Sequence, residues 1–118
     1  MAEFSVVTET HENPRIIVIK TTGYLEDKAG EKIKSIVQTY IDKGEKRYIF
    51  HLGGSPIINS TGISCILELT EEITCELQGR LAFCCLSKAI NDVFKIMNLS
   101  STYPVLETFE AAVAEVSR

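Results

Sequence analysis

Hydrophobic residues change their spacing repeatedly along this chain, and the changes divide it into alternating strands and helices. Short runs rich in β-branched and aromatic residues predict strands. Segments in which apolar residues recur every three or four positions predict helices. The predicted strands cover residues 4–8, 16–20, 48–52, 81–86 and 103–106. The first two predicted helices cover residues 27–42 and 61–77. Two later helices are predicted from apolar faces, one at Ile90, Val93, Phe94 and Met97 and the other at Phe109, Ala112, Val113 and Val116.

Small polar residues and glycines stand where these helices should begin and end. Asp27, Ser87 and Thr108 each precede a periodic apolar segment. Side-chain oxygens of such residues cap helix N-termini, so we expect all three to be caps. Gly44 and Gly79 follow the first two helical segments, where C-terminal glycines are common.

Turn signals and strand composition predict the fold class. Asn13-Pro14 separates the first two strands, which should form a hairpin, and Gly53-Gly54-Ser55-Pro56 should be a loop. The order ββαβαβαβα indicates an α/β fold with a mixed, mostly parallel sheet of about five strands packed with four helices. The continuous apolar run at residues 81–86 predicts a strand covered on both faces. Pro104 places the last strand at an edge.

Length and charge narrow the class of protein. The 118 residues fit a single domain spanning residues 1–118, with 45% hydrophobic and 24% charged residues. The net charge of −4 argues against direct nucleic-acid binding. No apolar run approaches the ~20 residues that cross a bilayer, so we expect no membrane partner. The N-terminus lacks the basic and apolar regions of a secretory signal, which predicts a cytoplasmic protein.

The four cysteines give no metal-binding pattern by their spacing. Cys65, Cys75, Cys84 and Cys85 form no Cys-x-x-Cys pair, and both histidines are distant in the sequence. We therefore expect no metal site. Cys84 and Cys85 lie within an apolar run, where buried thiols usually act as small hydrophobic side chains.

Ser60 is the candidate functional residue. It directly precedes the second predicted helix, and its hydroxyl could simply cap that helix. Gly62 in the first turn costs helix stability and could expose backbone to another molecule. The segment also follows a strand at the carboxyl edge of a parallel sheet, where ligand sites concentrate. A phosphoryl group on Ser60 would meet unpaired N–H groups and the positive end of the helix dipole.

Three segments resemble the sulphate transporter and anti-sigma factor antagonist (STAS) domain family. Residues 50–63 match its apolar strand, short loop and Asp-Ser-Ser/Thr-Gly-Leu helix start. Residues 20–26 match its Gly-x-Leu-Asp stretch, and residues 85–99 match its late strand and the helix that follows. Their sequences are Phe-His-Leu-Gly-Gly-Ser-Pro-Ile-Ile-Asn-Ser-Thr-Gly-Ile, Lys-Thr-Thr-Gly-Tyr-Leu-Glu and Cys-Leu-Ser-Lys-Ala-Ile-Asn-Asp-Val-Phe-Lys-Ile-Met-Asn-Leu.

The resemblance implies a STAS fold and an anti-sigma factor antagonist that switches partners and is not an enzyme. The unphosphorylated form would bind an anti-sigma factor that is also a serine kinase of the histidine-kinase-like ATPase type, releasing the sigma factor. Phosphorylation of Ser60, with Thr61 as the minor alternative, would end that binding, and a serine phosphatase would restore it. The protein itself would hold no cofactor, because the kinase binds ATP and Mg²⁺, and it would be a monomer or weak dimer. The expected partner surface comprises Glu26, Ile57, Ile58, Asn59, Ser60, Thr61, Gly62 and Ile63.

Two positions depart from the family pattern. Asn59 stands where the family usually has Asp, and Glu26 replaces the usual Asp of the earlier loop. Asn59 keeps size and hydrogen-bonding capacity and removes a negative charge beside the candidate phosphoacceptor. Ile57 and Ile58 are adjacent, so in extended backbone one should face the core and the other the solvent.

Three alternatives remain open from the residues alone. The chain could be a STAS scaffold subunit or a component of a lipid-transport system, in which Ser60 is only a cap. Ser60, His51 and Asp27 could form a hydrolytic triad, although the Gly-x-Ser-x-Gly elbow is missing. A nucleotide could bind at Gly53-Gly54, although neither of the usual glycine-rich phosphate-binding motifs is present.

Overall fold

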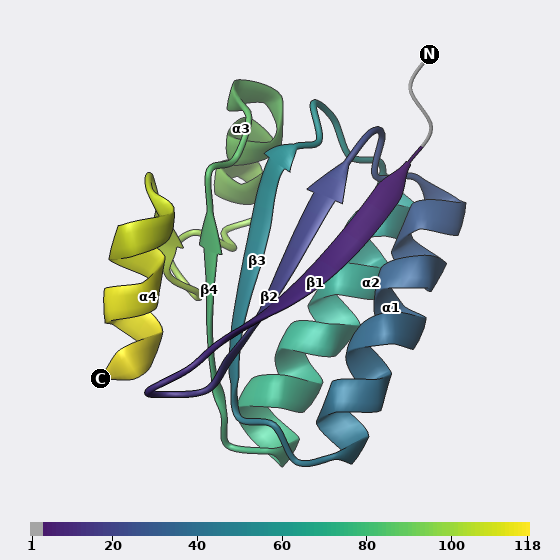
Figure 1. Cartoon of the computed structure of the whole chain (residues 1–118). Helices are drawn as coiled ribbons and strands as arrows, with labels where there is room; N and C mark the ends of the chain where they lie inside the picture. The colour runs from purple at the N-terminus through teal and green to yellow at the C-terminus, as the bar shows by residue number, and fades with distance from the viewer. Residues whose placement is uncertain (1–3) are drawn as a thin grey trace.

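The N-terminal hairpin opens a five-stranded sheet whose other neighbouring strands run parallel (Figure 1). The computed structural model of the chain describes residues 4–118. Residues 1–3, on which part of the signal-sequence expectation rests, lie outside the described residues. The strands are β1 (Ser5–His11), β2 (Ile16–Thr22), β3 (Arg47–Gly54), β4 (Arg80–Cys84) and β5 (Val105–Leu106), and they lie in that order across the sheet.

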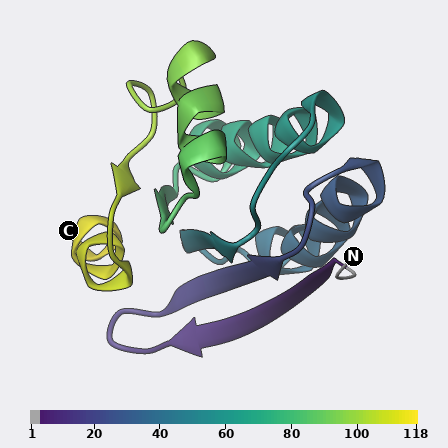
Figure 2. The same ribbon diagram turned by 90° about the horizontal axis from the view of Figure 1, so that it is seen from above.

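The helices follow the predicted order and cover both faces of the sheet. The order ββαβαβαβα and the mixed α/β sheet are confirmed. Helices α1 and α2 pack together on one face, while α4 packs against β3, β4 and β5 (Figure 2). The elements are α1 (Asp27–Asp42), α2 (Ser60–Glu71) with its π-helical continuation η1 (Glu72–Glu76), α3 (Lys88–Ile96) and α4 (Phe109–Ser117). No helix within residues 4–118 has the length and apolarity needed to cross a bilayer.

The two faces of the sheet bury cores of different size. The larger core joins β2, β3 and β4 to α1, α2 and α3, and the smaller core lies beneath α4. Strand β4 alternates between them, as predicted for a strand covered on both faces: Leu81 and Phe83 face the larger core, and Ala82 and Cys84 face the smaller one. Side chains at successive positions of one strand therefore lie in two different cores, one on each face of the sheet.

Several predicted boundaries agree with the structure. Ser87 Oγ accepts a hydrogen bond from Ile90 N at 3.2 Å, and Thr108 Oγ1 accepts one from Ala111 N at 3.1 Å, so both are N-caps. Gly44 follows α1 with a φ of +80°. A φ of this sign lies in the left-handed region, which glycine adopts without the steric cost that other residues incur.

Three local predictions were wrong. Glu26 precedes α1 as its N-cap residue without a side-chain hydrogen bond, and Asp27 is already the first helical residue. Gly53 and Gly54 belong to β3, because Gly54 pairs with Thr22 and extends the sheet beyond the predicted loop start. Met97 follows the last residue of α3 and is 46% exposed, so it does not belong to the buried face of that helix.

Candidate functional site

Two loops meet at the carboxyl edge of the sheet, and their backbones hold each other in place. The loop after β2 and the loop after β3 form a parallel bridge between Leu25 and Ile58. Leu25 N donates to Ile57 O at 3.0 Å, and Asn59 N donates to Leu25 O at 3.1 Å. These bonds hold residue 59 against the neighbouring loop, so the start of α2 is fixed by a segment more than thirty positions earlier in the chain.

Asn59, and not Ser60, caps α2. Its Oδ1 accepts a hydrogen bond from Gly62 N at 2.9 Å, while its Nδ2 donates to Asp27 Oδ1 at 3.0 Å. Ser60 is the first residue of the helix. The prediction that Ser60 is the cap was therefore wrong by one position. The amide also explains a departure from the family pattern, because a carboxylate at position 59 could not donate to Asp27.

Asn59→Ala is expected to lower the free energy of unfolding by about 1–2 kcal/mol, because it removes a side-chain cap and leaves Gly62 N without that partner. Urea denaturation followed by circular dichroism measures the change. Ser60→Ala is the matched control and should stay within about 0.5 kcal/mol of the wild type, as exposed substitutions away from caps usually do. A larger loss for Ser60→Ala than for Asn59→Ala would contradict this assignment.

Ser60 and Thr61 present their side chains to solvent in the first turn of α2. Ser60 Oγ makes no hydrogen bond with any residue between 4 and 118, so capping does not occupy the hydroxyl. The positive end of the helix dipole lies beneath it. Two acidic residues at the start of α1 lie nearby: Asp27, which is exposed and bonded to Asn59, and Glu26, which is half-buried. The Ser60 hydroxyl is thus accessible to solvent. The helix end beneath it favours an anion, whereas the nearby start of α1 is acidic.

Gly62 and Ile63 belong to the interior of the protein. A Cβ on Gly62 would collide with Leu25 O, and the side chain of Ile63 is 2% exposed. The glycine is therefore needed for the close approach of α2 to the loop after β2. Both residues were expected on the partner surface. Both are buried, so they can contribute to that surface only through the packing of α2.

The neighbouring isoleucines divide as predicted. Ile57 is 46% exposed, whereas Ile58 is half-buried and packs against the larger core. Ser87 Oγ donates to Pro56 O at 2.8 Å, which attaches this loop to the start of α3. Ser87 was predicted only as a cap, and nothing in its sequence context indicates this second contact. Ile57 is the exposed apolar side chain next to the accessible serine.

The proposed hydrolytic triad does not assemble. His51 lies over the smaller core, where its ring centroid is 6.4 Å from that of Phe109 on α4. Ser60 starts α2 on the opposite face of the sheet, and Asp27 is bonded to Asn59. The nucleotide alternative also loses its expected structure, because Gly53 and Gly54 extend β3 and do not form a phosphate-binding loop.

Comparisons with known proteins agree with this geometry. The model of the STAS domain family matches residues 7–113. BtrV of Bordetella bronchiseptica, provisionally named an anti-sigma factor antagonist, is 30% identical over 92 residues, which are 78% of each chain.

Solved structures of low sequence identity share the fold. An anti-sigma factor antagonist from Mycobacterium paratuberculosis superposes with a TM-score of 0.86 at 15% identity, over 98% of this chain and 96% of that one. The Bacillus cell fate determinant SpoIIAA in its phosphorylated form gives a TM-score of 0.73 at 23% identity, over 93% of this chain and 99% of that one.

Proposed function

The chain belongs to the STAS domain family, and from this membership we propose that it is an anti-sigma factor antagonist switched by phosphorylation of Ser60. The unphosphorylated protein binds an anti-sigma factor that is also a serine kinase, and so releases a sigma factor. Phosphorylation ends the binding, and a serine phosphatase restores it. The relative BtrV and the structural neighbours named as antagonists support this role.

The accessible hydroxyl of Ser60 carries the proposal. Asn59 supplies the cap, so a phosphoryl group on Ser60 can form without removing a hydrogen bond that holds α2. In the transfer, Ser60 Oγ bonds to the γ-phosphorus of ATP, the bond to the leaving ADP breaks, and a base of the kinase accepts the hydroxyl proton. ATP and Mg²⁺ belong to the kinase, so the antagonist itself needs no cofactor.

Added charge is the physical basis of the switch. A phosphoserine carries about −1.5 to −2 charges at neutral pH. The new charge lies on the same surface as Asp27 and Glu26, within a site that the partner must cover. Burying it against an apolar or acidic partner surface costs desolvation and repulsion. The fold need not change, because the helix N-terminus favours the anion.

The proposed contact surface is narrower than the sequence suggested. It comprises the exposed or half-buried residues around the helix start, with Ile57 as the apolar anchor. Gly62 and Ile63 support this surface from inside. The contact residues are Glu26, Ile57, Ile58, Asn59, Ser60 and Thr61. A kinase that uses cytoplasmic ATP places this exchange in the cytoplasm.

A phosphorylation assay tests the proposal. Purified histidine-kinase-like ATPases encoded near this gene are incubated with the protein and ATP, and the modified residue is located by mass spectrometry. One phosphoryl group on Ser60 is expected. Thr61→Ala, which removes the adjacent exposed hydroxyl, should still be modified, and Ser60→Ala should not. Modification of neither residue by any of these kinases would favour a scaffold or lipid-transport role.

A further inference from the structure

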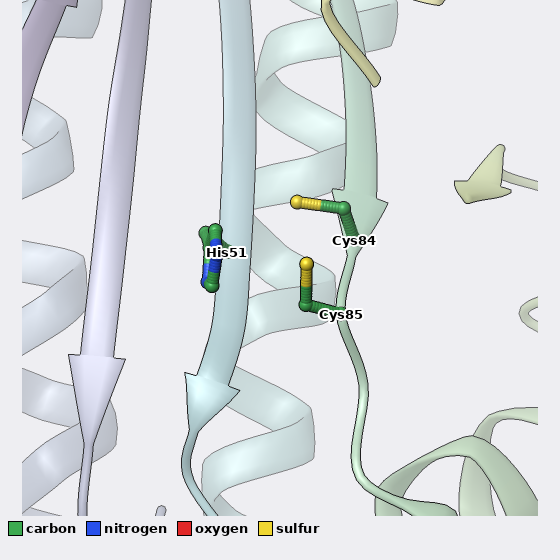
Figure 3. Close-up of side chains that lie close together, drawn as sticks. All are labelled: His51, Cys84 and Cys85. Atoms are coloured by element: carbon green, nitrogen blue, oxygen red, sulfur yellow. The ribbon is translucent and has the colours of Figure 1, made fainter. Parts of the chain in front are cut away.

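Three side chains of the types that can bind a metal converge on the face of the sheet that α4 covers. His51 comes from β3, and Cys84 and Cys85 come from the end of β4 (Figure 3). One ligand atom from each residue lies within 4.8 Å of the others. Figure 3 shows both sulfur atoms in the space between the two strands. The three residues are named the His-Cys-Cys cluster below.

The backbone of Cys85 places the two thiols on one face. Successive side chains of an extended strand point to opposite faces, so Cys85 should face away from Cys84. Its φ of +62° interrupts the extended backbone directly after β4. Both cysteines consequently belong to the smaller core. A positive φ at a cysteine is uncommon and carries a steric cost, which makes the convergence of the two sulfur atoms notable.

Gly53 makes room for the imidazole. A Cβ at this position would lie 2.6 Å from His51 Cε1 and 3.3 Å from Cys85 Cβ, so any larger residue would displace the ring. The backbone N–H of Gly53 donates to the Nδ1 lone pair of His51 at 3.2 Å, and this long hydrogen bond must open for the neutral imidazole to offer its one lone pair to an ion. The glycine that the sequence placed in a loop therefore shapes the His-Cys-Cys cluster.

We propose that the His-Cys-Cys cluster binds one Zn²⁺ ion. Two thiolates and one imidazole are a common three-ligand set for zinc, with a water molecule completing the tetrahedron. With Zn–S near 2.3 Å and Zn–N near 2.1 Å, tetrahedral geometry separates ligand atoms by roughly 3.5–3.8 Å. The three ligand atoms lie within 4.8 Å of one another, which is within about 1 Å of the separations that one ion requires.

Charge favours Zn²⁺ over Cu⁺ at this position. Binding forms two Zn–S bonds and releases both thiol protons to solvent, so Zn²⁺ and two thiolates are together neutral. The same ligands with Cu⁺ would leave one negative charge in a partly buried site, which is costly. The nearby charged groups, Lys20 and Glu110, have opposite signs.

An ion can reach the site from the surface. Cys85 and His51 are both half-buried, whereas Cys84 is fully buried. A hollow of about 370 Å³ borders Cys85 and is lined by Cys85, Leu86, Asn91, Val105, Leu106 and Glu107. The more exposed thiol is thus the first ligand that an entering ion meets.

The test is titration of the full reduced chain with Zn²⁺, monitored by competition against a chromophoric chelator. One ion per chain is expected, and Cys85→Ser should weaken its binding by more than about 100-fold, since changes to outer-shell partners alone cost 10- to 100-fold. Gly53→Ala should weaken it by roughly 10- to 100-fold through displacement of the ring. Substitution with Co²⁺ should give the absorption of a tetrahedral thiolate site, and Cys85→Ser should remove it.

Cys75→Ser is the matched control, because Cys75 is an exposed thiol outside the cluster. It should bind Zn²⁺ like the wild type, and circular dichroism confirms that each variant is folded. Equal loss in Cys75→Ser and Cys85→Ser would show adventitious thiol binding and overturn the proposal. Failure to bind Zn²⁺ would also overturn it, including the case in which only Cu⁺ binds.

Discussion

Ser60→Asp is expected to weaken binding to the anti-sigma factor kinase by roughly 150-fold, which corresponds to ~3 kcal/mol. The substitution places a permanent negative charge at the first residue of α2, beside Asp27 and the exposed Ile57. A partner that covers this surface must then desolvate an unpaired charge. Isothermal titration calorimetry with the kinase that modifies Ser60 measures the loss.

The fold should tolerate this substitution. An acidic residue in the first turn interacts favourably with the helix dipole, and Asn59 continues to cap the helix. Ser64→Asp is the matched control, because Ser64 is also exposed and lies one turn further along α2. It adds the same charge away from the helix start and should reduce binding far less. Binding by Ser60→Asp at wild-type strength would contradict the switch.

Phe83→Ala is expected to lower the free energy of unfolding by about 3–5 kcal/mol, the usual cost of removing a fully buried aromatic ring. The ring of Phe83 stacks on Phe50 with centroids 5.3 Å apart and meets the edge of Phe94 at 4.9 Å. It joins β3, β4 and α3 at the centre of the larger core. Chemical denaturation measures the loss.

The smaller core supplies a comparison for this substitution. Phe109 on α4 is half-buried and lies over the other face of the sheet. Phe109→Ala should cost clearly less, because truncation leaves a smaller cavity that solvent can partly fill. Equal losses for the two variants would mean that both faces contribute alike to stability, contrary to the difference in their cores.

The sequence predicts the elements well because their signals are local. Ser87 and Thr108 cap their helices as expected, since a polar residue before a periodic apolar segment is sufficient information. The start of α2 is different. Asn59 and Ser60 are both good caps, and the choice between them is made by the bridge from Leu25. Such a long-range contact leaves no periodic signal in the chain.

The candidate site shows the same limit. Sequence correctly indicated that one of Ile57 and Ile58 would be exposed, because alternation is a property of extended backbone. It failed for the His-Cys-Cys cluster. Adjacent cysteines on a strand should diverge, and only the positive φ of Cys85 brings them together with a histidine from the neighbouring strand. The backbone of one residue therefore brings together side chains whose spacing in the sequence gives no sign of their proximity.

The bridge between Leu25 and Ile58 also limits how this chain can change length in evolution. Surface loops usually accept insertions, because their backbones are solvated and independent of one another. Backbone hydrogen bonds join residue 25 of the loop after β2 to residues 57 and 59 of the loop after β3. An added residue in either loop would break that pairing and turn the first residues of α2 away from their present direction. The turn between β1 and β2 has no backbone hydrogen bond to another loop within residues 4–118, so it is the easier place for an insertion.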